Sequence, residues 1–153
     1  MGATKIIDRD HGYKSLMRAA SGSRQGRRLR VGVDGDDEMQ LVASVQEFGS
    51  ETVPSRSFIR AWFDDNRARI AEDLRNVAKQ SITTGVSRDE LMAALGRLYR
   101  DEIQERILHG LNPALKEQTI KHKLEHGDPA TPLVTSAGNL ISSIVAMLDE
   151  QIV

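Results

Sequence analysis

Two long stretches of the chain place apolar residues every three or four positions, which is the spacing of amphipathic helices. The first stretch predicts a helix over about residues 56–80, and the second predicts a helix over about residues 88–109. Polar residues fill most of the remaining positions, so each helix is expected to bury one face. The residues expected to face the core are Phe58, Ile59, Trp62, Phe63, Ile70, Leu74 and Val77 in the first helix, and Met92, Leu95, Tyr99, Ile103 and Ile107 in the second.

Apolar residues alternate with polar or small ones over residues 29–33, which predicts a half-buried strand. An acidic cluster follows, in which Asp36 or Asp37 is placed to cap the next helix. A closing strand is expected within residues 145–153. Shorter helices are predicted over about residues 8–20, 38–48 and 113–124, and after Gly138.

These elements predict an α+β fold, with two long helices and shorter ones packed on a small, mainly antiparallel sheet. The length of 153 residues fits a single domain over residues 1–153. Small and polar residues predict a flexible segment at about residues 21–28.

Composition excludes some functions. The chain has no cysteine, which excludes disulfides and a thiolate nucleophile and fits a protein made in a reducing cytosol. No apolar run approaches the roughly 20 residues of a membrane span, so no membrane partner is expected. The net charge of −1 gives no general attraction to nucleic acid.

Basic residues are nevertheless concentrated at one place. Arg24, Arg27, Arg28 and Arg30 are followed directly by the acidic run 34–38. This cluster is a candidate interface with a protein partner, although a solvated loop whose charges only confer solubility is the favoured interpretation. A nucleic-acid-binding module that uses these arginines on phosphates is the alternative function, and the acidic neighbours argue against it.

Candidate catalytic chemistry is sparse. His122 and His126 share a helix face, and with Glu125 they spell the inverted H-x-x-E-H zinc pattern, but no third ligand presents itself. A surface pair is favoured over a metal enzyme. No G-x-S-x-G nucleophile motif occurs. We therefore expect no catalytic, metal or cofactor site, and a protein that is not an enzyme.

Three stretches carry a family resemblance. Residues 47–60 (EFGSETVPSRSFIR) resemble the HEFG…IPxRxFLR signature of the tail-completion and neck proteins of long-tailed bacteriophages, also grouped as virion-morphogenesis or minor tail components. Residues 111–123 (LNPALKEQTIKHK) resemble that family's PLxxxTIxRK segment, and residues 132–144 (PLVTSAGNLISSI) resemble its PLxDTGxLLxSI ending. The three blocks occur in the family's order, with Gln46 standing where the family has histidine.

The motif residues indicate architecture. Phe48 is expected to anchor the end of its helix, and Gly49 to take the left-handed turn that stops it. Pro54 stiffens the connection to the next helix. Arg56 and Arg60 share a helix face and pair either with acidic groups of a neighbouring subunit or, within the chain, with Glu51 or Asp64. The residues of this set are Glu47, Phe48, Gly49, Pro54, Arg56, Phe58 and Arg60 in the first block, and Gly138, Leu140 and Ile144 in the third.

The resemblance implies a structural virion protein at the head–tail junction, as a neck, collar or tail-completion component made in the host bacterial cytoplasm. Its implied partners are other phage neck and tail proteins, namely the connector adaptor, the tail terminator or the tail tube. A homo-oligomeric ring in the virion is also implied, with DNA contact as a secondary feature. A closed ring needs two different patches on each subunit. The first expected patch is the basic cluster with its acidic neighbours, and the second is the exposed face of the first long helix.

Overall fold

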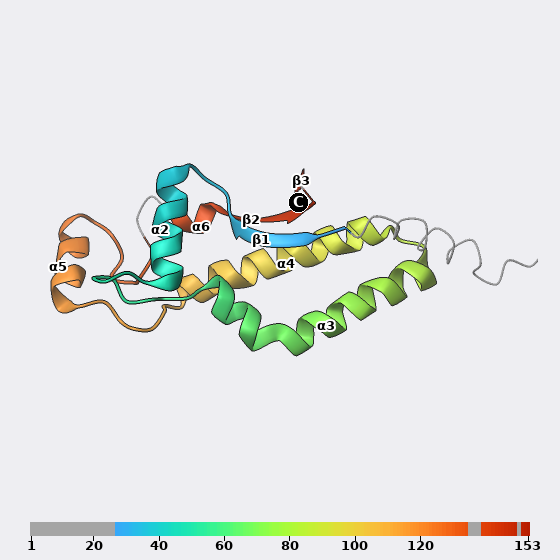
Figure 1. Ribbon diagram of the computed structural model, residues 1–153, viewed down its shortest axis with the longest axis horizontal. Coiled ribbons are helices and arrows are strands. Elements are labelled where there is room, and N and C mark those ends of the chain that lie inside the picture. The colour runs from blue at the N-terminus through green and yellow to red at the C-terminus, as the bar shows by residue number, and fades with distance from the viewer. Residues whose placement is uncertain (1–26, 135–138, 150) are drawn as a thin grey trace, which may run out of the picture.

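A computed structural model of the chain describes residues 27–134, 139–149 and 151–153 and has an elongated shape (Figure 1). The predicted helix over 8–20, Arg24 and Gly138 lie outside these residues. The elements are β1 (Leu29–Val33), α2 (Asp37–Phe48), α3 (Ile59–Thr84), α4 (Arg88–Leu108), α5 (Glu117–Glu125), α6 (Asn139–Ser142), β2 (Ile144–Leu148) and β3 (Gln151–Ile152). The predicted α+β class, with two long helices and a small antiparallel sheet, is confirmed.

The sheet has the strand order β1-β2-β3, and both pairs are antiparallel. In the first pair Leu29 lies opposite Leu148 and Val33 lies opposite Ile144. Alternate residues of β2 are buried, as the period of two requires. Gly96 allows α4 to approach this sheet closely, because a Cβ at that position would lie 3.2 Å from the Cβ of Ala146.

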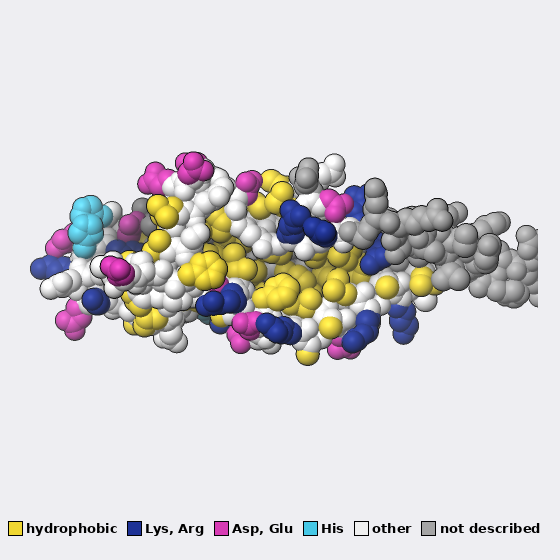
Figure 2. All heavy atoms as spheres, in the orientation of Figure 1, with side chains coloured by type: hydrophobic (Ala, Val, Ile, Leu, Met, Phe, Trp, Pro, Cys, Tyr) yellow, Lys and Arg dark blue, Asp and Glu magenta, His cyan; other side chains and the backbone are white. Residues whose placement is uncertain are grey.

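Helix α4 lies between the sheet and α3 (Figure 1). With neighbours on two sides it buries four of its five predicted core residues, and Leu95 is half-buried. Helix α3 packs mainly against α4, so its buried stripe is narrower than predicted. The expectation that Phe63 and Leu74 face the core is wrong, because they are 49% and 40% exposed. In Figure 2, apolar side chains gather on the visible face between α3 and β1.

The helix ends follow local chemistry. Asp36 caps α2 as predicted, because its Oδ1 accepts the N–H of Met39 at 2.9 Å. Helix α5 begins at Glu117 instead of at residue 113, and the Asn112–Pro113 peptide bond before it is cis. None of the helices in the described ranges is both long enough and apolar enough to span a membrane.

Candidate functional site

The end of α2 turns the chain sharply toward α3. Gly49 ends the helix as predicted and has a positive φ of 83°, but its ψ of 175° is extended and differs from the left-handed turn that was expected. Its N–H donates to the carbonyl of Val45 at 2.8 Å. A Cβ at this position would lie 2.9 Å from the nitrogen of Ser55 and 3.2 Å from the oxygen of Val53. Only glycine therefore fits both the backbone conformation and the close approach of the following loop.

The Glu47 carboxylate caps the beginning of α3 from inside the protein. Its side chain is 7% exposed. It accepts the hydroxyl of Ser57 at 2.5 Å and the backbone N–H groups of Phe58, Ile59 and Arg60 at 2.9, 3.1 and 2.9 Å. The first N–H groups of a helix have no partner within the helix, and they carry partial positive charge that favours an anion. A residue of α2 thus completes the first turn of α3.

These contacts set the charge of Glu47. Burial by itself raises the pKa of this carboxyl, but the hydrogen bonds from Ser57, Phe58, Arg60 and Ile59 together outweigh burial and hold the pKa below its ordinary value. Glu47 is therefore ionised at neutral pH and is a weak base. An anion held by four donors suits a structural role.

Arg56 connects the same loop to the segment between α4 and α5. Its side chain is buried, and Nε donates to the carbonyl of Pro113 at 2.8 Å while Nη2 donates to that of Ala114 at 3.4 Å. Its backbone N–H donates to Gln46 at 2.7 Å. The expectation that Arg56 pairs with Glu51 or Asp64 is wrong, because its guanidinium donates to Pro113 and Ala114. Backbone carbonyls take the place of the expected carboxylates.

Lys123 connects the second and third motif-like blocks. Its ammonium donates to the carbonyls of Thr131 and Val134 at 2.9 and 2.5 Å. Burial lowers the pKa of this group, and the nearby charge of Asp128 offsets part of that effect. In the third block, Leu140 and Ile144 are buried as predicted. The blocks 47–60, 111–123 and 132–144 thus meet in one hydrogen-bonded region, which we call the joint.

Two motif residues lie on the surface of the joint. Phe48 is 66% exposed, so the expectation that it anchors the end of α2 is wrong. The guanidinium carbon of Arg60 lies 5.4 Å from the centre of the Phe48 ring, a cation–π distance. Arg60 does not pair with Asp64, which bonds Arg67 instead. A groove of about 340 Å³ lies beside the pair, lined in part by Val33, Ala43, Phe58 and Ile59.

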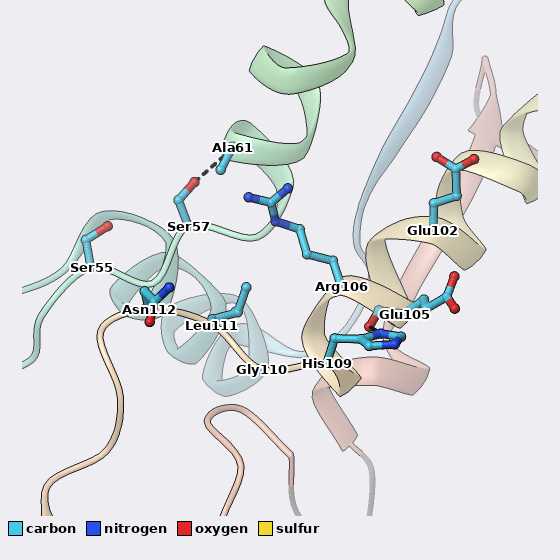
Figure 3. A pocket seen from close by; sticks show the side chains of 10 residues that line it. All are labelled: Ser55, Ser57, Ala61, Glu102, Glu105, Arg106, His109, Gly110, Leu111 and Asn112. Atoms are coloured by element: carbon cyan, nitrogen blue, oxygen red, sulfur yellow. Dashed lines mark hydrogen bonds between the residues drawn. The ribbon is translucent and has the colours of Figure 1, made fainter.

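A second pocket, of about 600 Å³, lies between the loop before α3 and the end of α4 (Figure 3). Several of its polar side chains already have partners. The Ser57 hydroxyl donates to Glu47 and accepts the N–H of Ala61 at 3.0 Å, and Arg106 pairs with Asp65 at 2.8 Å. The ring Nδ1 of His109 contacts the carbonyl of Glu105 at 2.9 Å. Ser57 is bonded to a weak base, an arrangement that fits helix capping better than nucleophile activation.

The predicted histidine pair lies at the surface of α5. The rings of His122 and His126 stack with their centres 4.2 Å apart, and Nδ1 of His126 lies 2.8 Å from the carbonyl of His122. Both side chains are exposed. Across residues 27–134, 139–149 and 151–153 there is no group of three or more histidine or carboxylate side chains placed to hold a metal ion.

The basic cluster is only partly available for a partner. Arg27 bridges Asp89 at 2.9 Å and Asp149 at 3.3 Å. Arg28 and Asp149 exchange two further hydrogen bonds, of 2.9 and 2.8 Å, that involve the Arg28 backbone. Arg30 is exposed on β1. The guanidinium of Arg27 therefore fixes the start of β1 to α4 and to the β2–β3 turn, instead of facing solvent alone.

Comparison with known proteins adds no relative. No protein-family model, no curated protein and no solved structure matches the chain. The role of the site is therefore inferred from the sequence and from the contacts described above.

Proposed function

We propose that this protein is a structural component of the virion of a long-tailed bacteriophage, at the head–tail junction, where it acts as a neck or tail-completion component. It assembles through protein–protein contacts and is not an enzyme. One observation carries this proposal beyond the motif resemblance. The three blocks that resemble the phage family are separated in sequence, yet they are linked by the hydrogen bonds of buried Arg56 and half-buried Lys123.

A joint built in this way fixes the relative positions of the surfaces on α2, α3 and α5. A subunit that is repeated in an assembly needs such a fixed geometry, because each copy must present the same surfaces to its neighbours. The buried and half-buried charged groups of the joint form hydrogen bonds within the chain. Glu47 is held by four donors, and Arg56 and Lys123 donate to backbone carbonyls. Such groups specify a geometry, and they are not available for substrate chemistry.

Phe48 and Arg60 are the part of the joint that a partner meets. An exposed aromatic ring beside a guanidinium and an apolar groove has the composition of an interaction hot spot. The partner proposed for this surface is another neck or tail protein: the connector adaptor, the tail terminator or the tail tube.

Light scattering of the purified protein, alone and mixed with the connector and tail components encoded beside it, tests the proposed function. We expect a ring or recruitment onto one of these components. Phe48→Ala is expected to weaken recruitment at least tenfold, a hot-spot effect. Phe63→Ala is the matched control, because Phe63 is also exposed but lies outside the groove. A monomer that binds none of the components contradicts the proposed function.

A further inference from the structure

A second groove, of about 520 Å³, lies on the joint between α2, α5, Leu133 and α6. Its volume is within the range of pockets that enclose ligand groups. Val42, on α2, is 42% exposed within it. The groove has an apolar lining formed by Met39, Val42, Leu115, Leu133 and Leu140.

The rim of this groove is acidic. Asp36 and Glu38 line it, and Figure 2 shows acidic side chains gathered at the N-terminal end of α2. Lys123 also lines the groove, but its ammonium is engaged by two carbonyls. The groove therefore favours an occupant that combines apolar side chains with positive charge.

The groove also contains an unused acceptor. Within the described ranges, Oε1 of Gln46 is buried and has no hydrogen-bond partner. A buried acceptor without a donor destabilises the folded state. Because this oxygen is shielded from solvent, an occupant of the groove bonds it only if the Gln46 side chain turns toward the groove.

The chain itself contains a sequence of the required composition. Residues 1–26 hold five Lys or Arg and two Asp, a formal charge of +3, whereas residues 27–153 hold 16 Lys or Arg and 20 Asp or Glu, a charge of −4. The apolar residues Tyr13, Leu16, Met17 and Ala20 follow the helical spacing i, i+3, i+4, i+7. This pattern predicts a basic amphipathic helix, the kind of ligand that fills apolar grooves.

The geometry favours docking between copies. Arg27, where this N-terminal sequence joins the described body, is held by Asp89 and Asp149 at the end where α4 begins. Helices α2 and α5 lie toward the opposite end of the molecule (Figure 1), and both line the groove. A contact from the Arg27 end of one copy to the α2–α5 end of another is head-to-tail. Repeated head-to-tail contacts close into a ring when the rotation between neighbouring copies is a whole fraction of a full turn.

We propose that residues 1–26 of one copy dock in the Val42 groove of a second copy. The role of this contact rests on the proposed function, since it supplies the heterologous interface that a neck ring requires. The apolar face of the predicted helix meets the groove lining, and its basic residues meet Asp36 and Glu38.

A labelled synthetic peptide of residues 1–26 tests the contact by fluorescence anisotropy. The receptor is the full chain carrying Leu16→Asp and Met17→Asp, which removes competition from its own N-terminal sequence. We expect saturable binding that weakens as salt is raised. Adding Val42→Asp to the receptor is expected to reduce affinity at least tenfold, whereas adding Leu41→Asp leaves it unchanged. Leu41 lies on the same helix, is 64% exposed and is outside the groove. Absence of binding, or equal losses with both changes, overturns the proposed contact.

Mixing two full-length variants shows whether the contact joins copies. The double Leu16→Asp, Met17→Asp variant keeps an intact groove, and Val42→Asp keeps an intact N-terminal sequence. Light scattering is expected to show monomers for each alone and a 1:1 heterodimer for the mixture. A mixture that stays monomeric means that the sequence docks on its own chain and overturns the proposal. If these results are as expected but virions lack the protein, only the proposed function fails. If virions contain the protein but the peptide does not bind, only the docking proposal fails.

Discussion

The guanidinium of Arg56 donates from Nε to the carbonyl oxygen of Pro113 at 2.8 Å, across 57 positions of the sequence. The same side chain reaches Ala114 through Nη2. Arg56 is buried, so these carbonyls and the guanidinium satisfy each other away from water. One side chain thereby fixes the loop before α3 against the segment between α4 and α5, and the geometry of the joint depends on this contact.

Replacing Arg56 by lysine is expected to lower the free energy of unfolding by about 1–3 kcal/mol, because an ammonium does not reproduce the planar fork that reaches both carbonyls. Urea unfolding at neutral pH measures the change through the transition midpoint. Arg60→Lys is the matched control. The Arg60 side chain is exposed, and a change there is expected to stay within about 0.5 kcal/mol. Equal effects of the two changes contradict the assigned role of Arg56.

Glu47→Gln is expected to destabilise the protein by about 2–3 kcal/mol at pH 7, because the amide replaces a charged acceptor of four hydrogen bonds with a single neutral oxygen. Urea unfolding provides the measurement. Glu51→Gln, an exposed carboxyl in the following loop, is expected to have little effect. A wild-type transition midpoint in Glu47→Gln means that the carboxylate does not cap α3.

The contribution of Glu47 also depends on pH. The pKa of this group is lower in the folded protein than its ordinary value of 4.5, so the unfolded chain binds the proton first as pH falls. The stabilisation is complete above pH 4.5 and is lost as pH falls through the lower folded pKa. The difference between wild type and Glu47→Gln is therefore expected to shrink on acidification below pH 4.5. A difference that stays constant down to the acid limit of folding contradicts the lowered pKa.

Gly49→Ala is expected to cost more than about 2 kcal/mol, because it combines a backbone conformation almost restricted to glycine with a Cβ 2.9 Å from the Ser55 nitrogen. Gly85→Ala tests the cost of a positive φ without a steric contact, in a left-handed helical conformation that alanine adopts more easily than the conformation of Gly49. Gly85 also has a positive φ, of 73°, but has open space around its Cβ position, so a loss of about 1 kcal/mol is expected. Thermal or urea unfolding separates the two, and equal losses would exclude the steric contact with the loop.

The sequence predicted the elements that depend on regular periods. The inward face of α4 and the half-buried strand β1 are confirmed, although Gly32 is as buried as its apolar neighbours in β1. The prediction for Phe63 and Leu74 is wrong because a helix with one main neighbour buries a narrow stripe, and periodicity does not reveal the number of neighbours. The predicted start of α5 is wrong because Asn112–Pro113 has the sequence of a helix start. In the structure the carbonyls of Pro113 and Ala114 instead accept hydrogen bonds from Arg56.

The sequence identified residues of the joint but did not predict their hydrogen-bond partners. Glu47 and Arg56 find their partners between 10 and 58 positions away, and nothing in local spacing identifies such partners. One signal was present in the sequence: each charged residue lies next to, or two positions from, a phenylalanine. This signal does not discriminate, because Arg60 is also two positions from Phe58 and is exposed.

Mass spectrometry of gradient-purified virions produced from the genome that encodes this chain tests the proposed function most directly. We expect the protein in intact virions at a fixed ratio to the connector and tail proteins, and the same ratio after repeated purification. Infected or induced cells that contain the protein while purified virions lack it would contradict a structural role at the head–tail junction.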